Sequence, residues 1–169
     1  MASYTLIRAA IEISAAAVWI LEPSEHEERV RRALRISAQN INDYIHAARG
    51  RGDALSPDVE RQSAEIDTRL RQLKFEKGQW LKSTEVVREV SRCARGDGSI
   101  LAAWRVYSAF AHGRLWSVTE QDLVPISIDK DNDTVVYWVT ADLGRVVAQA
   151  MAAMDTIDHA IRLYRRRAA

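Results

Sequence analysis

Cysteine is nearly absent from this chain. Its 169 residues include one cysteine, Cys93, so an intramolecular disulfide is excluded. No other Cys and no His lies near Cys93 at the spacing of metal ligands, which argues against a zinc site there. A lone cysteine is typical of a reducing compartment. We therefore expect a cytoplasmic protein in which Cys93 is a small core residue.

An excess of charge of either sign is also lacking. The 24 basic and 23 acidic residues leave a net charge of +1, which excludes a general electrostatic attraction to nucleic acid or to an anionic membrane. The apolar run 13–21 has about nine residues, too few to span a bilayer. Glu22 and Pro23 follow it directly, and no cleavage pattern of a signal peptide is present. We expect no membrane association, and the sequence leaves open whether an element precedes Met1.

Proline and glycine are scarce, which leaves room for long helices. With three prolines and seven glycines, the apolar spacing predicts helices over residues 3–21, 24–49, 57–77, 84–94, 100–112 and 140–164. Ser24 and Glu27 form the pattern of a capping box, and Ser56 precedes a first-turn proline, Pro57. Alternating apolar residues on either side of a polar turn predict a β-hairpin over residues 123–139.

These elements predict a mainly α fold. We expect one domain over residues 1–169, a bundle of five to six helices with the small β-hairpin before the last helix. The 47% hydrophobic content is enough for one core. The last helix carries a stripe of large apolar side chains, which we expect to form its inner face: Leu143, Val147, Met151, Met154, Ile157 and Ile161.

A polar stripe in the fifth helix carries the strongest hint of chemistry. Arg105, Ser108 and His112 share one face, since Arg105 and His112 are only roughly 20° out of phase on a helix. The first helix contains Arg8 and Glu12 within an apolar segment. If both lie in the core, each needs an internal partner, and Ser108 and His112 are natural partners. Two interpretations stay open: a hydrogen-bond network that fixes the register of the helices, or a polar pocket.

The spacing of Arg105 and His112, with six residues between them, resembles the motif of HEPN-type helical-bundle proteins. Tyr107 and Ser108 followed by His112 and Gly113 are also similar to a segment of uncharacterised bacterial helical families. Those families carry an early Arg/Glu pair as well. The HEPN resemblance implies a toxin or defence component that cuts RNA without a metal, through residues brought together in a dimer.

Roles for individual residues follow from this resemblance. His112 would be the general acid or base, Arg105 would hold the phosphate, and Arg114 would assist. Binding or support would come from Arg8, Glu12, Tyr107 and Ser108. The implied partners are RNA, a second copy of the chain and an antitoxin or other protein. No metal and no cofactor are expected, and the Glu-x-x-His motifs of di-iron bundles do not occur in the sequence.

Helix geometry sets a condition on catalysis. Seven residues of helix rise about 10 Å, so Arg105 and His112 of one copy do not readily clamp one phosphate. The catalytic interpretation therefore predicts a homodimer that combines these residues from two chains. The alternative is a non-catalytic interaction or scaffold module in which Arg8, Glu12, Ser108 and His112 form a buried network. The sequence leaves open whether the protein is an enzyme.

Overall fold

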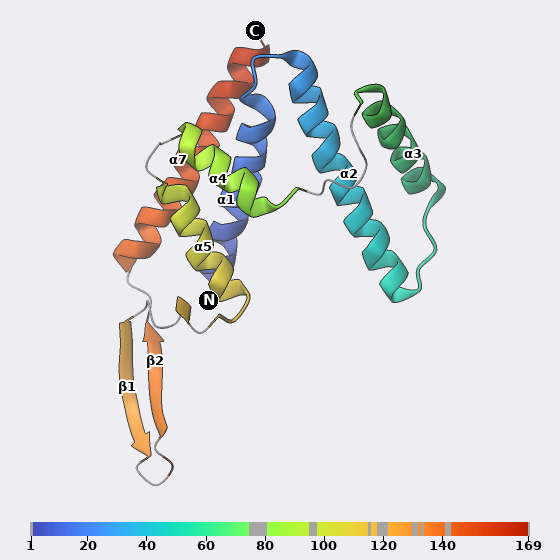
Figure 1. The fold of residues 1–169 in the computed structure, drawn as a ribbon. Coiled ribbons are helices and arrows are strands. Elements are labelled where there is room, and N and C mark those ends of the chain that lie inside the picture. The colour runs from blue at the N-terminus through green and yellow to red at the C-terminus, as the bar shows by residue number, and fades with distance from the viewer. Residues whose placement is uncertain are drawn as a thin grey trace. The chain divides into compact units, whose positions relative to one another are not determined.

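The computed structural model describes residues 2–74, 81–94, 98–114, 116–117, 122–129, 132, 134–140 and 143–168. These ranges contain six helices and one antiparallel hairpin, which precedes the last helix (Figure 1). The predicted mainly helical fold with this hairpin is confirmed. The helices are α1 (Ala2–Leu21), α2 (His26–Arg51), α3 (Pro57–Gln72), α4 (Ser83–Ala94), α5 (Ser99–Ala111) and α7 (Leu143–Ala168), and the strands are β1 (Asp122–Asp129) and β2 (Thr134–Thr140).

The chain divides into two compact units. The larger unit comprises residues 1–18 and 87–169, and the smaller unit comprises residues 19–86. Both α1 and α4 contribute residues to each unit. The single domain expected over residues 1–169 stays a prediction.

The core of the larger unit is built by helical faces of regular spacing. Tyr4 of α1 stacks on two rings of α5, with 5.1 Å between its ring centroid and that of Tyr107 and 4.7 Å to that of Phe110. In α4, the buried Ser91 hydroxyl accepts a hydrogen bond of 3.3 Å from the Leu101 amide at the start of α5. In α1, the buried residues Tyr4, Ile11, Ala15 and Val18 follow one another at intervals of seven, four and three. In α5, the buried residues Ala103, Trp104 and Tyr107 lie three, four and seven positions after the buried Ile100.

Cys93 does not belong to this core. In the part of α4 that belongs to this unit, Val90 and Ser91 lie three and four residues after Val87, and all three are buried. Cys93 lies off this side of the helix and is exposed. The prediction of a core cysteine was therefore wrong, because the small apolar character of the residue did not show which side of the helix it occupies.

The smaller unit contains an antiparallel pair of helices, α2 and α3 (Figure 1). The predicted start of α3 is confirmed, since Ser56 caps the helix by accepting from the Val59 amide at 3.4 Å and Pro57 is its first residue. The capping box predicted for α2 was wrong. Its N-cap residue is Glu25, which makes no side-chain capping bond, and the Ser24 hydroxyl donates to a Glu25 carboxylate oxygen instead.

The hairpin pairs β1 with β2 from Asp122 opposite Thr140 to Asp129 opposite Thr134. The register shifts between Pro125 and Ser127, as expected next to a proline that has no amide to donate. Five large apolar side chains of the hairpin are exposed: Ile126, Ile128, Val135, Val136 and Tyr137. In the described part of the chain the two strands pair only with each other.

The predicted inner face of the last helix was wrong. The buried residues of α7 are mostly small: Ala152, Ala153, Thr156, Ala160 and Leu163. The large side chains expected in the core are exposed instead: Leu143, Val147, Met151, Met154, Ile157 and Ile161. Small residues allow α7 to pack closely against α5, and this leaves the large apolar stripe on another side of the helix.

Among the described helices, α1 alone is long and apolar enough by composition to cross a membrane. Its Tyr4 is buried against α5, and the charged pair Arg8 and Glu12 lies within its apolar span. About 33% of this apolar window is buried in the structure.

Candidate functional site

The side chains of α5 divide between a buried and an exposed side. The buried side is centred on Tyr107 and includes Trp104, while Arg105 and His112 are exposed. On a helix, Tyr107 lies roughly 200° from Arg105, so burying the tyrosine turns the arginine outward. The polar stripe is therefore the solvent side of an amphipathic helix.

The way in which α5 ends explains why a His-Gly pair stands at residues 112 and 113. His112 is the C-terminal cap residue, and Gly113 has a φ of 61°, in the left-handed region that favours glycine. The Gly113 amide donates to the Phe110 carbonyl at 3.1 Å, and the Arg114 amide donates to the Ala109 carbonyl at 2.9 Å. This pair of bonds is the Schellman motif that ends many helices. The His-Gly pattern thus marks a helix end.

No side-chain partner holds the proposed catalytic residues among the residues that the structure describes. Arg105, His112 and Arg114 are all exposed, and their side chains form no ion pair or hydrogen bond there. Along the helix, Arg105 and His112 are separated by about 10 Å. Both are accessible to a ligand, but nothing in the described part of the chain orients them for proton transfer.

Arg8 and Glu12 form a half-buried ion pair. The Arg8 Nη2 lies 3.5 Å from Glu12 Oε2, with 25% and 33% of the two side chains exposed. The guanidinium carbon of Arg8 lies 6.0 Å from the centroid of the Trp104 ring, within reach of a cation–π contact. Within the described residues, neither Ser108 nor His112 hydrogen-bonds to this pair. The structure brings Arg8, Glu12 and Trp104 together, and the expected four-residue network is not formed.

Tyr107 is a core residue. It is 2% exposed and stacks on Tyr4. Burial, and then the neighbouring Tyr4, raise the pKa of Tyr107 to about 12. The phenol therefore keeps its proton at neutral pH and supports the position of α5 rather than a titrating site.

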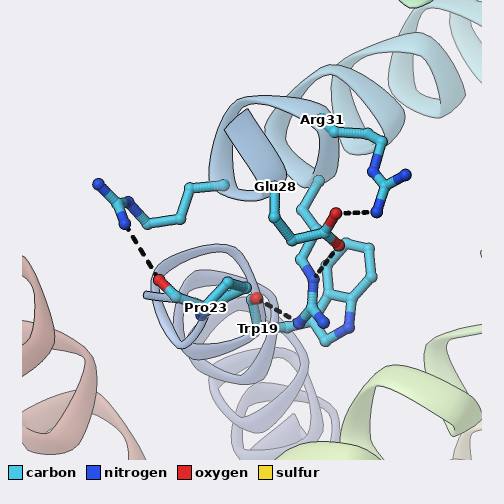
Figure 2. A network of polar contacts seen from close by, with 6 residues as sticks. Trp19, Pro23, Glu28 and Arg31 are labelled. Carbon is cyan, nitrogen blue, oxygen red and sulfur yellow. Dashed lines mark hydrogen bonds and ion pairs between the residues drawn. The ribbon is translucent and has the colours of Figure 1, made fainter. Parts of the chain in front are cut away.

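A polar network in the smaller unit was missed by sequence reasoning (Figure 2). Arg32 of α2 donates from Nη1 to the Trp19 carbonyl at 2.8 Å and from Nε to a Glu28 carboxylate oxygen at 3.0 Å. Its guanidinium carbon also lies 4.6 Å from the centroid of the Trp19 ring. Arg29 donates to the Pro23 carbonyl at 3.1 Å, and Arg31 pairs with Glu28.

This network closes the C-terminal end of α1. Pro23 prevents the helix from continuing, which leaves carbonyl groups at the helix end in need of donors. Arg32 of α2 supplies a donor to one of them, the Trp19 carbonyl, and Arg29 donates to the Pro23 carbonyl just after the helix. Burial alone would raise the pKa of Glu28, but hydrogen bonds from Arg32 and Arg31 outweigh this and lower the pKa. The signal in the sequence was a run of arginines near the start of a helix, where the helix dipole disfavours cations, so they needed acceptors elsewhere.

The largest set of exposed apolar side chains on one described helix lies on α7. We call it the α7 apolar face, formed by Leu143, Val147, Met151, Met154, Ile157, Ile161 and Tyr164. These side chains are between 40% and 75% exposed. On the helix, the centre of this face lies roughly 150° from the centre of the buried side. The two sides of α7 can therefore make separate contacts.

Metal ligands are not gathered in the described part of the chain. No group of three or more His, Cys, Asp or Glu side chains there could hold a metal ion. The expectation of no metal and no cofactor stays a prediction.

Comparisons with known protein families, with curated proteins and with solved structures found no match. The resemblance of Arg105 and His112 to the HEPN motif therefore gains no support from known proteins. Interpretation of function depends on the surfaces of the chain itself.

Proposed function

We propose that this chain is a helical protein–protein interaction module. The observation that carries the proposal is the α7 apolar face, where seven large side chains stay exposed along one helix. Single exposed apolar residues are common on protein surfaces, but a continuous stripe of them is typical of an interface. The module acts by burying this face against another helix or groove.

The rest of the larger unit fits a supporting role. The stack of Tyr4 on Tyr107 and Phe110 fixes α1 against α5, and α5 packs against the small-residue side of α7. This core does not use the large residues of the α7 apolar face. The support thus comes from aromatic packing instead of the polar network expected from the sequence.

Site-specific photo-crosslinking tests this function. A photo-reactive amino acid placed at Met154, in the middle of the α7 apolar face, should cross-link a protein when the chain is irradiated in cells that express it natively. The matched control carries the same group at Tyr44 of α2, which is also exposed but has no such stripe around it. Equal cross-linking at the two positions, or none at Met154, would contradict the proposed function.

A second candidate is an RNA-directed module of a toxin or defence system, acting as a metal-independent ribonuclease. The observation that favours it is the exposure of Arg105 in the middle of α5 and of His112 and Arg114 at its end. His112 would transfer the proton and the two arginines would hold the phosphate. This candidate includes a homodimer, an antitoxin as protein partner, and a cytoplasmic location without membrane attachment.

RNA cleavage in the presence of EDTA tests the second candidate. The purified chain should degrade RNA, His112→Ala should abolish the activity, and His46→Ala, at another exposed histidine, should retain it. Cleavage that persists in His112→Ala would eliminate His112 as the catalyst. A wild type without cleavage would remove this candidate altogether.

A further inference from the structure

We propose that the α7 apolar face binds a second copy of this chain, with the two α7 helices antiparallel. This inference rests on the proposed interaction function and names the partner. The interface would lie on α7, whereas the catalytic interpretation needs the α5 helices of two copies to face each other.

The exposed area matches what a stable dimer needs. With roughly 200 Å² for a fully exposed large apolar residue, the exposed fractions of the seven residues correspond to roughly 800 Å² of surface. A standard interface buries about 800 Å² on each partner. The largest apolar patch on a typical monomer is only about 300–600 Å². The face is therefore large enough to hold two copies together without another surface.

The spacing of the face indicates a helix as the partner. From Leu143 to Tyr164 the face takes six steps over 21 residues, which is 3.5 residues per step. This is the period that keeps an apolar seam turned toward a neighbouring helix in coiled-coil packing. In a symmetric pair, α7 itself supplies a helix of the same length and period.

Charge favours the antiparallel arrangement. Asp158 lies at the edge of the face and pairs with Arg162, while Arg165 also lies at its edge in the last turns. In a parallel pair, each of these charged residues would lie beside the identical residue of the other copy. The two basic C-terminal ends would then also lie together. In the antiparallel pair, the Leu143 end of one helix meets the Tyr164 end of the other. The basic clusters then lie at opposite ends of the interface.

The same charges disfavour a membrane as the occupant. A helix that adsorbs to anionic lipid carries Lys or Arg along its polar face. In α7, four arginines are concentrated in the last turns, at Arg162, Arg165, Arg166 and Arg167, and the exposed carboxylates Asp155 and Asp158 lie on one side of the middle of the apolar face. The middle of the helix therefore lacks the row of cations that would hold it on anionic lipid. A second copy is the occupant that both the apolar and the charged residues fit.

Sedimentation equilibrium of the purified chain tests the stoichiometry. We expect the wild type to be a dimer, and we expect Met154→Asp to raise the dissociation constant about a hundredfold or more. The matched control Tyr44→Asp should remain dimeric. Because Met154 is exposed, the far-ultraviolet circular dichroism of Met154→Asp should match that of the wild type. Equal loss of the dimer in both variants would overturn the assignment to α7.

Disulfide cross-linking tests the orientation. In a Cys93→Ser background, Leu143→Cys and Tyr164→Cys are made in separate chains. When the two variants are mixed and oxidised, the antiparallel pair should give a disulfide between the cysteine at position 143 of one copy and the cysteine at position 164 of the other. Each variant alone should remain uncross-linked. Efficient cross-linking of each variant with itself would indicate a parallel pair if the mixture gave no more cross-linked product than the separate variants. This result would overturn the proposal.

The remaining outcomes separate this inference from the proposed function. A monomeric wild type would overturn the proposal that the partner is a second copy of the chain. Cross-linking of a different protein at Met154 would then preserve the interaction function, and the absence of any cross-link there would remove both. Co-flotation of a monomeric chain with anionic phospholipid vesicles, lost in Met154→Asp, would identify a membrane as the occupant and overturn the proposal.

Discussion

Alkaline pH should destabilise this protein through one buried phenol, Tyr107. In the folded chain the pKa of Tyr107 is raised to about 12 by burial and by the neighbouring Tyr4. In the unfolded chain the phenol titrates near pH 10. The folded state therefore holds the phenolic proton more tightly. Its contribution to stability is fully present below about pH 10 and is lost as the pH rises through about 12.

The magnitude follows from the difference in pKa. Two pKa units correspond to about 3 kcal/mol of unfolding free energy, lost by the time Tyr107 is ionised in both states. Because Tyr107 is only 2% exposed, solvent screening offers little relief. Burial also raises the pKa of Tyr4, so Tyr4 adds a loss of the same sign. The Tyr107→Phe variant should lack only the share of this loss of unfolding free energy that is due to Tyr107.

The assay is urea unfolding followed by circular dichroism from about pH 8 to about pH 12. Tyr107→Phe keeps the ring stacked on Tyr4 and removes the ionisable group. By about pH 12, where Tyr107 is half ionised in the folded chain, the stability of this variant should have fallen by about 2 kcal/mol less than that of the wild type. Tyr44→Phe, at an exposed tyrosine, should follow the wild type. If the wild type and Tyr107→Phe lost stability in parallel, the raised pKa of Tyr107 would be refuted.

Three further predictions concern the local structure and use chemical unfolding at neutral pH. Glu12→Gln should lower the free energy of unfolding by less than about 1 kcal/mol, since its ion pair with Arg8 is only half buried; a loss of 3 kcal/mol or more would indicate the buried network expected from sequence. Arg32→Met should cost about 2 kcal/mol by leaving a helix-end carbonyl without its donor, whereas Arg31→Met should cost less than about 0.5 kcal/mol; equal losses would contradict this. Gly113→Ala should cost about 1 kcal/mol through its left-handed backbone alone, because the added methyl group meets no atom within 4 Å; an unchanged stability would show that the helix end rearranges.

Local patterns predicted the elements of the fold well. The helix with Ser56 and Pro57 at its start was found from two adjacent residues whose effect is local. The hairpin was found from alternation over about 17 residues that contain a polar turn. Each of these signals depends on the backbone of a short segment. Tertiary contacts were not needed to recognise them.

The side that each helix buries was harder to predict. Ala153 and Met154 are neighbours in α7, yet Ala153 is buried and Met154 is exposed. A ranking by hydrophobicity favours the methionine for the core. Close packing of helices instead favours small residues at the contact, and larger apolar residues are then left for another surface. The sequence pattern shows that α7 has apolar sides but does not show which one the chain covers itself.

In α5, too, the buried side of the helix was not identified from the sequence. Arg105 and His112 were singled out because polar residues of two types share one face of a helix. Trp104 and Tyr107, in the same helix, define the buried side by their spacing with Ile100 and Ala103, and this signal was available in the sequence. The network around Arg32 was missed because its acceptors are main-chain carbonyls. Every residue has a main-chain carbonyl, so the residue types in the sequence do not show which carbonyl at a helix end accepts a hydrogen bond.

A motif defined by residue types loses weight when each residue has a structural reason to be where it is. Gly113 takes the left-handed conformation that ends α5, His112 precedes it as the cap, and Tyr107 fills the core. Arg105 then falls on the solvent side, where an arginine needs no special purpose. The α7 apolar face has no such reason within the described part of the larger unit, because the buried residues there do not include it and the exposure of apolar side chains to water is unfavourable. Among the described residues, this face makes the stronger demand for a partner, and a function of this chain is best sought there first.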